Sequence, residues 1–152
     1  MEIEVITLSN HDIAKFKELI DVYVSVFELE NFSYPGQNQL VKLLNNPGSV
    51  VLVAMHHGKV TGGLTAHILQ TYEWPSPTVY VSDLAVSADY QRQGIGKRLI
   101  EGLKNFCAGQ GYQQFFIQAE SDDHQAVNFY RSTPISEEIH AIQFNYNIEK
   151  SQ

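Results

Sequence analysis

A strand that ends at a glycine-containing turn and continues into a helix constrains this chain more than any other feature of its sequence. Residues 79–86 are rich in β-branched and apolar side chains and predict a buried strand. Residues 91–96 follow with a Gly-x-Gly turn, and apolar spacing from Ile95 onward predicts a helix. A strand, turn and helix in this order indicate an α/β domain.

The turn itself is suited to binding an anion. The first N–H groups of a helix have no partner inside it, and the helix dipole adds partial positive charge there. Gly94 and Gly96 would let a phosphate approach the backbone closely, and Arg92, Lys97 and Arg98 bring positive charge to a chain of net charge −7. The spacing excludes the Rossmann and P-loop motifs. A glycine loop before an ordinary helix is the alternative.

The residues of this turn resemble a motif of a known superfamily. Gln91-Arg92-Gln93-Gly94-Ile95-Gly96 resembles the Gln/Arg-x-x-Gly-x-Gly/Ala acetyl-coenzyme A motif of the GCN5-related N-acetyltransferases (GNAT), and Asp83-Leu84-Ala85-Val86 resembles their fourth strand. Nearly the whole chain is similar to the aminoglycoside 3-N-acetyltransferases of this superfamily, through residues 80–88, 118–120, 122–123, 126–127 with Tyr130, and 137–138. The resemblance implies the GNAT fold, a mixed central β-sheet flanked by helices that binds acetyl-CoA at a splayed central strand.

The resemblance also implies how acetyl-CoA binds as cosubstrate. The main chain of Leu84, Ala85 and Val86 would hold the pantetheine arm, and the N–H of Val86 would polarise the thioester carbonyl. The remaining cofactor-binding residues implied are those of the turn and the helix start, namely Gln91, Arg92, Gln93, Gly94, Ile95, Gly96 and Lys97.

Tyr130 matches the family tyrosine that protonates the leaving sulfur, and an aromatic side chain packed beside Phe129 is the alternative. Two departures from the family pattern occur nearby. Asp123 stands where the family often has Asn, and residues 131–135 replace the usual Gly-Phe/Ile with a proline-containing turn.

Acidic residues indicate a cationic acceptor. Asp83 lies near the end of the central strand, and Glu120, Asp122 and Asp123 follow the next strand, so we expect them around one opening. An amine and a carboxylate 4 Å apart attract by about 4 kcal/mol at an effective dielectric of 20. We hypothesise that Asp83 positions the amine and acts as base, directly or through water, with Glu120 as second choice; a helix or turn cap is the alternative for each. Glu28 is a further candidate contact, or simply solvated.

Three functions fit these residues. The first is acetyl-CoA-dependent N-acetylation of an aminoglycoside at its 3-amino group by direct attack in a ternary complex, which would make the chain an antibiotic-resistance enzyme. The second is the same chemistry on a polyamine or a protein lysine. The third is a non-catalytic acyl-CoA-binding module. Asp83 and Tyr130 favour the two enzymes, whereas the glycine loop fits all three.

Length and composition place these functions in one domain over residues 1–152. The acidic balance argues against nucleic acid and anionic membranes as partners. Cys107 is the single cysteine, so no disulfide can form within the chain, and no run of residues resembles an export signal or a membrane span. We therefore expect a soluble cytoplasmic protein. His56 and His57 are adjacent on a predicted strand and point to opposite faces, so we expect no metal site.

The remaining patterns predict alternating helices and strands. Strands are predicted at 3–8, 49–56, 59–71, 112–119 and as a final pair at 138–148; helices at 13–27, 39–45, 95–107 and through Arg131. Edge strands in the final pair would join two subunits, which predicts a homodimer.

Overall fold

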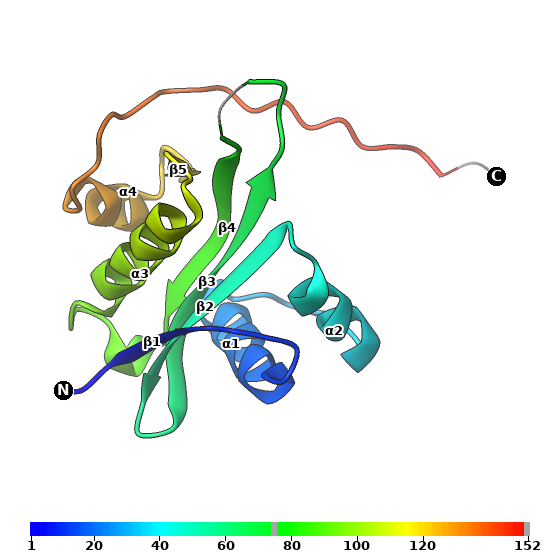
Figure 1. Cartoon of the computed structure of the whole chain (residues 1–152), viewed down its shortest axis with the longest axis vertical. Coiled ribbons are helices and arrows are strands. Elements are labelled where there is room, and N and C mark those ends of the chain that lie inside the picture. Colours follow the sequence, from blue (N-terminus) through cyan, green and yellow to red (C-terminus); the bar gives the residue numbers. More distant parts are fainter. Residues whose placement is uncertain (74–75, 151–152) are drawn as a thin grey trace. The chain divides into compact units, whose positions relative to one another are not determined.

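The structure, a computed structural model that describes residues 1–73 and 76–150, has five strands in one mixed sheet of order β1-β2-β3-β4-β5 (Figure 1). The first four strands are antiparallel neighbours, and β5 is parallel to β4. The elements are β1 (Glu4–Thr7), α1 (Ile13–Val26), α2 (Gln37–Asn45), β2 (Ser49–His56), β3 (Lys59–Leu69), β4 (Thr78–Val86), the 3-10 turn η1 (Ala88–Tyr90), α3 (Ile95–Gln110), β5 (Phe115–Ile117) and α4 (His124–Arg131). The mixed α/β class is confirmed.

The chain forms two compact units, Met1–Gln118 and Ala119–Gln152. The first contains the whole sheet and the helices α1 to α3, and the second contains α4 and the residues that follow it. The single domain over residues 1–152 stays a prediction. No helix in the described part of the chain is long and apolar enough to cross a membrane.

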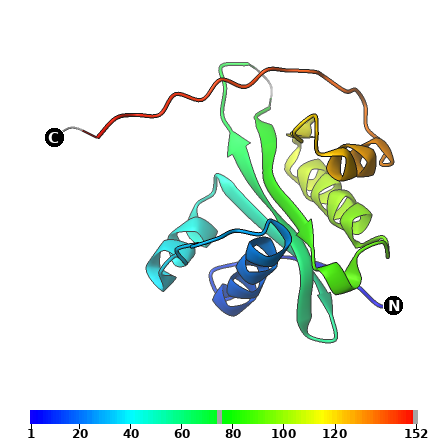
Figure 2. The same cartoon turned by 180° about the vertical axis from the view of Figure 1, so that it is seen from behind.

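Helices cover both faces of the sheet in the first unit (Figures 1 and 2). The α3 side buries Leu99 and Leu103 against Leu52 and Leu64, and the opposite side buries Leu19 of α1 among the residues of its own cluster. The spacing of Phe16, Leu19, Ile20 and Tyr23 places these buried side chains on one stripe of α1, as the helical periodicity predicts. Each fully buried leucine stabilises the fold by about 1.5–3 kcal/mol relative to an exposed one.

A β-bulge lies in the middle of β4. Val81 is opposite Ala66 and Asp83 is opposite Thr65, so Ser82 is an extra residue without its own partner on β3. The bulge changes which face of the sheet the following residues occupy. Val81 packs in the cluster on the α3 side, whereas Ala85 packs in the cluster on the α1 side. The side chains of Ser82 and Asp83 therefore come to the same face.

The strand β4 extends beyond its parallel neighbour. Pairing between β4 and β5 ends at Val81 and Ile117, although β4 continues to Val86. The predicted strand at 112–119 is thus shorter in the structure, where β5 has 3 residues. The splayed central strand implied by the resemblance is present as a backbone feature: residues 83–86 of β4 are paired with β3 alone within the described ranges.

The predicted final strand pair at 138–148 is wrong. Residues 137–150 contain no strand. A β-strand needs a neighbour to satisfy its backbone N–H and C=O groups, and an alternating sequence cannot supply that neighbour. In this segment Ile142, Phe144, Tyr146 and Ile148 are all largely exposed. The predicted helix 39–45 begins two residues earlier, at Gln37, and the helix predicted at 95–107 continues to Gln110.

Candidate functional site

The backbone of β4 is open beside Leu84 and Val86. The N–H of Ser87 donates to the carbonyl of Thr61 at 2.8 Å. This bond shows which residues of β4 point their N–H groups toward β3 and which point them away. Antiparallel strands alternate between residues that bond each other and residues whose polar groups point away. Counting back from Ser87, the N–H groups of Leu84 and Val86 point away from β3, toward the side of β4 that has no pairing with β5 after Val81.

Two glycines of β3 allow close contacts, Gly62 with β4 and Gly63 with α1 and β2. A Cβ on Gly62 would lie 2.7 Å from the carbonyl oxygen of Ala85 and 3.1 Å from the Cα of Val86. A Cβ on Gly63 would lie 2.6 Å from a methyl group of Leu19. These contacts are too short for any side chain, so Gly62 sets how closely the open part of β4 lies against β3, and Gly63 sets how closely α1 packs on the sheet.

The glycine turn follows directly and is tied back to β4. The side-chain amide of Gln91 donates to the carbonyl of Val86 at 2.9 Å, which leaves the N–H of Val86 as the group facing the open side. Arg92 has φ 61° and Gly94 has φ 82°, so both residues of this turn have a left-handed backbone conformation. Gly94 is the N-cap of α3 and provides no side-chain cap to the first N–H groups of the helix.

The three cations of this region have different roles in the structure. Arg98 donates from Nη2 to the carbonyl of Ile3 at 2.7 Å, so its guanidinium holds the start of the chain onto α3. Arg92 and Lys97 are exposed, and neither takes part in an ion pair within the described ranges. The unpaired positive charge at the helix start therefore belongs to Arg92 and Lys97.

On the sheet face that packs against α1, the bulge in β4 brings polar side chains together around Asp83. Oδ2 of Asp83 accepts a hydrogen bond of 2.7 Å from the hydroxyl of Thr65 and one of 3.1 Å from the hydroxyl of Ser82. Nε2 of His67 lies 3.0 Å from the same Ser82 hydroxyl. Asp83 is half-buried and has no ion pair in the described part of the chain. Neutral hydroxyls orient its carboxylate without neutralising it.

Aromatic rings extend this face of the sheet toward β5. Tyr80 stacks on Phe116 with ring centroids 5.0 Å apart, and the ring of His67 lies 6.4 Å from that of Tyr80. Sequence reasoning missed Thr65 and His67. Their alternate spacing on one predicted strand places them on one face, but nothing in the sequence indicated that the bulge would bring Ser82 beside them.

Glu28 lies just after α1, which packs on the same sheet face that carries Asp83. Its backbone has φ 52°, and its side chain is exposed without an ion pair in the described ranges. The neighbouring loop exposes aromatic side chains, of which Phe32 packs edge-on against Tyr34 at 5.1 Å. The hydroxyl of Tyr34 donates to Asp21 at 2.9 Å, which fixes this part of the loop.

The predicted acidic residues of the second unit have distinct surroundings. Oδ1 of Asp123 accepts a hydrogen bond of 3.1 Å from the N–H of Ala126, so Asp123 is the N-cap of α4. Glu120 and Asp122 are exposed, and their carbonyls accept from the N–H groups of Asp123 and His124 at 3.0 Å. The helix cap therefore falls on Asp123, and not on Asp83 or Glu120, for which the sequence offered it as the alternative.

Tyr130 lies on α4 with its ring 5.1 Å from that of Phe129 in an edge-to-face contact. Burial, together with the negative charge of Asp123, raises the pKa of Tyr130 to about 12. Its hydroxyl consequently keeps its proton at neutral pH and can donate a hydrogen bond. The packing beside Phe129 and a role as donor are compatible.

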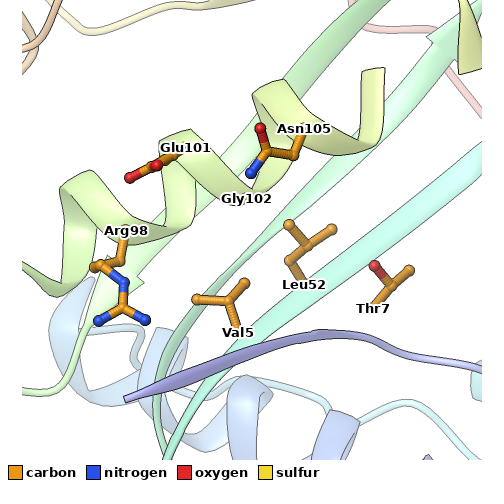
Figure 3. Close-up of a pocket in the computed structure, with 7 residues that line it drawn as sticks. All are labelled: Val5, Thr7, Leu52, Arg98, Glu101, Gly102 and Asn105. Atoms are coloured by element: carbon orange, nitrogen blue, oxygen red, sulfur yellow. The ribbon is translucent and has the colours of Figure 1, made fainter. Parts of the chain in front are cut away.

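A groove of about 340 Å³ lies elsewhere in the first unit, between β1 and α3 (Figure 3). Val5, Thr7 and Leu52 line it from the sheet, and Arg98, Glu101, Gly102 and Asn105 line it from α3. Figure 3 shows the side chains of Glu101 and Asn105 on α3 facing those of Val5, Leu52 and Thr7 on the strands. Apart from Arg98, which binds Ile3, no residue of the predicted site belongs to it.

Comparison with known proteins places this geometry in a family. Residues 16–133 match the acetyltransferase (GNAT) family. Comparison with curated proteins finds no match. Among solved structures, the chain is similar to the aminoglycoside acetyltransferase meta-AAC0020 from an uncultured soil metagenomic sample in complex with sisomicin, with 39% identity, a TM-score of 0.95 and 97% of each chain covered.

Two further structures share the architecture. The aminoglycoside acetyltransferase HMB0005, also from an uncultured soil metagenomic sample, is 28% identical with a TM-score of 0.86 over 97% of this chain and 100% of its own. AAC(6')-Iy in complex with the bisubstrate analogue CoA-S-monomethyl-acetylneamine is 14% identical, with a TM-score of 0.79 over 97% of this chain and 100% of its own. At this identity the likeness shows the fold alone. The family match, together with the open strand and the glycine turn, shows that this chain belongs to the GNAT acetyltransferase family.

Proposed function

We propose that this protein transfers the acetyl group of acetyl-CoA to the 3-amino group of an aminoglycoside by direct attack in a ternary complex. The observation that carries the proposal is the carboxylate of Asp83, which is half-buried, held by two hydroxyls and not neutralised by any cation in the described ranges. Such a group attracts a polycationic acceptor. The 39% identical meta-AAC0020 has been crystallised with sisomicin, which supports this class of acceptor.

The residues along β4 and the glycine turn fit acetyl-CoA as cosubstrate. The outward N–H groups of Leu84 and Val86 suit the amides of a pantetheine arm, and the uncapped start of α3 with Arg92 and Lys97 suits a pyrophosphate. Acetyl-CoA supplies an activated thioester, so no covalent enzyme intermediate is required. The N–H of Val86 would donate to the carbonyl oxygen as negative charge develops on it.

Asp83 would bind the ammonium form of the acceptor and help to remove its proton. Val86 lies three positions after Asp83, which is about 10 Å along an extended strand. That distance favours a relay through water over direct removal of the proton by the carboxylate. The hydroxyls of Thr65 and Ser82 would hold the carboxylate in the orientation that the relay needs. Glu120 stays the second choice of base, with Asp122, Asp123 and Glu28 as further contacts to the cation.

Tyr130 would stabilise the leaving sulfur. Because its pKa is raised to about 12, its hydroxyl is protonated throughout the neutral range. Complete transfer to a thiolate of ordinary pKa, about 8.5, is uphill by about 5 kcal/mol. We therefore infer that Tyr130 acts mainly by donating a hydrogen bond as negative charge develops on the sulfur.

We further propose that the protein is a cytoplasmic homodimer that confers antibiotic resistance. A reducing compartment is supported by Cys107, which is buried and unpaired and whose thiol has its pKa raised by burial. The dimer is supported by the exposed apolar residues that follow α4.

The decisive experiment measures thiol release from acetyl-CoA with sisomicin and other gentamicin-type aminoglycosides, with spermidine and with a lysine peptide. We expect turnover confined to the aminoglycosides, and NMR of the product should locate the acetyl group on the 3-amino nitrogen. Acetylation at another position would refute the regiochemistry alone. Turnover with spermidine or the peptide alone would refute the acceptor class, and binding without any turnover would refute the enzyme.

Two substitutions with matched controls test the residues. We expect Asp83→Asn to lower kcat/KM by at least a hundredfold. The matched control Glu101→Gln removes an exposed carboxylate from α3 and should leave kcat/KM unchanged. Tyr130→Phe should lower kcat by about tenfold with little effect on acceptor KM, whereas Tyr72→Phe, at a position 97% exposed, should have no effect. Unchanged turnover in both Asp83→Asn and Tyr130→Phe would overturn the mechanism.

A further inference from the structure

The hydroxyl of Ser82 is surrounded by the polar groups that accompany Asp83. Four polar atoms lie within hydrogen-bond distance of its oxygen: Nε2 of His67 at 3.0 Å, the Thr65 hydroxyl at 3.1 Å, Oδ2 of Asp83 at 3.1 Å and the Thr65 carbonyl oxygen at 3.3 Å. A serine hydroxyl has one proton to donate and two lone pairs that accept. The order of the network therefore depends on which neighbour receives that single proton.

The carboxylate of Asp83 sets the direction of these hydrogen bonds. A bond to a charged acceptor is about twice as strong as a bond between neutral groups. The hydroxyl of Thr65 makes the shortest contact, 2.7 Å to Oδ2 of Asp83, so its proton is donated there. The proton of Ser82 is drawn the same way, to Oδ2 directly or through the oxygen of Thr65. In either arrangement Ser82 has no proton left for His67.

His67 is consequently the donor in its contact with Ser82. Nε2 and the hydroxyl oxygen are 3.0 Å apart, and two atoms that both lacked a proton would repel each other at this distance. A neutral ring then carries its proton on Nε2 and leaves Nδ1 unprotonated. The bonds run in one direction, from His67 through Ser82 toward Asp83. Hydrogen bonds that point the same way along a chain strengthen one another.

The ring of His67 is supported by its neighbours on the sheet. His67 is half-buried and lies opposite Tyr80 in the register of β3 and β4. The two ring centroids are 6.4 Å apart, and Tyr80 stacks in turn on Phe116 at 5.0 Å. These contacts restrict the rotation of the ring, so Nε2 stays directed at Ser82.

We propose that His67 is a positioning residue whose Nε2–H donates to Ser82 and thereby holds the proton of Ser82 toward Asp83. Without this bond the Ser82 hydroxyl can turn and donate to the carbonyl of Thr65, 3.3 Å away, and the carboxylate loses a donor. A carboxylate held by fewer bonds is less well oriented toward the amine of the acceptor. Only this last step rests on the proposed function, because the direction of the bonds is a property of the free protein.

NMR of the full chain with ¹⁵N-labelled histidine tests the direction of the bonds without any substrate. We expect a neutral His67 ring with a visible Nε2–H proton, since the bond to Ser82 slows its exchange with water. The chain has 6 histidines, so the signal is assigned by its loss in His67→Gln. Ser82→Ala removes the acceptor of this bond and should make the proton exchange too fast to be observed. A ring protonated on Nδ1 alone, or a signal that Ser82→Ala leaves unchanged, would overturn the proposal.

Steady-state kinetics tests the consequence for acetyl transfer. His67→Phe keeps an aromatic ring beside Tyr80 but has no N–H. We expect it to lower kcat/KM for the aminoglycoside about fivefold and to leave the KM for acetyl-CoA unchanged. His67→Gln retains an N–H donor and should restore most of the activity. Equal activity of the unaltered protein and His67→Phe would contradict the positioning role.

A double-mutant cycle decides whether His67 acts through Ser82. In a chain that already carries Ser82→Ala, His67→Phe should lower kcat/KM by less than about twofold, because the hydroxyl that it positions is gone. An equal loss in both backgrounds would show that His67 does not act through Ser82 and would overturn the proposal. Circular dichroism of each variant checks that the sheet remains folded. If no acceptor is acetylated, the NMR experiment still tests the bond, so this inference and the proposed function can fail independently.

Discussion

The hydroxyl of Thr65 on β3 donates a hydrogen bond of 2.7 Å to Oδ2 of Asp83 on β4, at the position where the bulge interrupts their register. This contact orients a carboxylate that has no ion pair in the described residues.

Thr65→Val removes the donor and keeps the shape of the side chain. We expect kcat/KM for the aminoglycoside to fall about tenfold, the loss of about 1.4 kcal/mol that a hydrogen bond to a charged group contributes. Thr65→Ser retains the hydroxyl and should restore most of the activity. Steady-state kinetics with both variants measures the effect, and full activity in Thr65→Val with a loss in Thr65→Ser would show that the methyl group matters instead.

Substitution of Arg92 should weaken acetyl-CoA binding, whereas substitution of Arg98 should lower the stability of the fold. We expect Arg92→Gln to raise the KM for acetyl-CoA about tenfold, because its unpaired charge is lost from the start of α3, with little change in Tm. Arg98→Gln loses the 2.7 Å bond to Ile3 and should lower the free energy of unfolding by about 1 kcal/mol while leaving that KM unchanged. Kinetics and thermal unfolding of both variants provide the comparison. The reverse pattern would place the phosphate contact on Arg98.

Alanine substitutions at Gly62 and Gly109 should change the free energy of unfolding in opposite directions. Gly62→Ala places a Cβ 2.7 Å from the backbone oxygen of Ala85, so we expect about 1–3 kcal/mol of destabilisation and weaker binding of acetyl-CoA. Gly109 lies within α3 and its Cβ would meet no atom within 4 Å, so Gly109→Ala should stabilise the protein by about 0.5–1 kcal/mol. Denaturant unfolding measures both changes. A neutral Gly62→Ala would mean that β4 can move away from β3.

Tyr130 should make stability depend on alkaline pH. Its pKa is about 12 in the folded chain and 10.0 in the reference state, so the folded protein holds the proton more tightly than the unfolded chain. The contribution is constant below pH 10, and stability falls as the pH rises from 10 to about 12. Tyr130→Phe should remove this part of the fall. Thermal unfolding of both proteins between pH 8 and 12 tests the prediction, and parallel curves would contradict it.

The sequence predicted most of the first unit because local signals there agree with the fold. The hairpin at His57 and Gly58 has positive φ at both turn residues, 49° and 75°, as a tight two-residue turn between alternating strands requires. The glycine turn was predicted from Gly94 and Gly96, and Gly94 is left-handed in the structure. Such features depend on a few neighbouring residues and can be read without tertiary information.

The arrangement around Asp83 could not be read in this way. A strand with regular alternation would place Ser82 and Asp83 on opposite faces, and only the offset between Thr65 and Ala66 brings them together. The role of Arg98 depends on Ile3, which is distant in sequence and adjacent only after folding. The strands expected at 138–148 were wrong because alternation indicates an amphipathic segment but does not say which chain pairs with it.

The open part of β4 separates two kinds of recognition within the proposed enzyme. On one side, contacts to the acetyl donor would come from main-chain N–H groups, whose direction depends on strand pairing and on Gly62 rather than on the side chains of Leu84 and Val86. On the other side, the acceptor would meet side chains such as Asp83 and His67. In such an enzyme, side-chain substitutions would change the range of acceptors while recognition of the acetyl donor, which depends on the backbone, would stay the same.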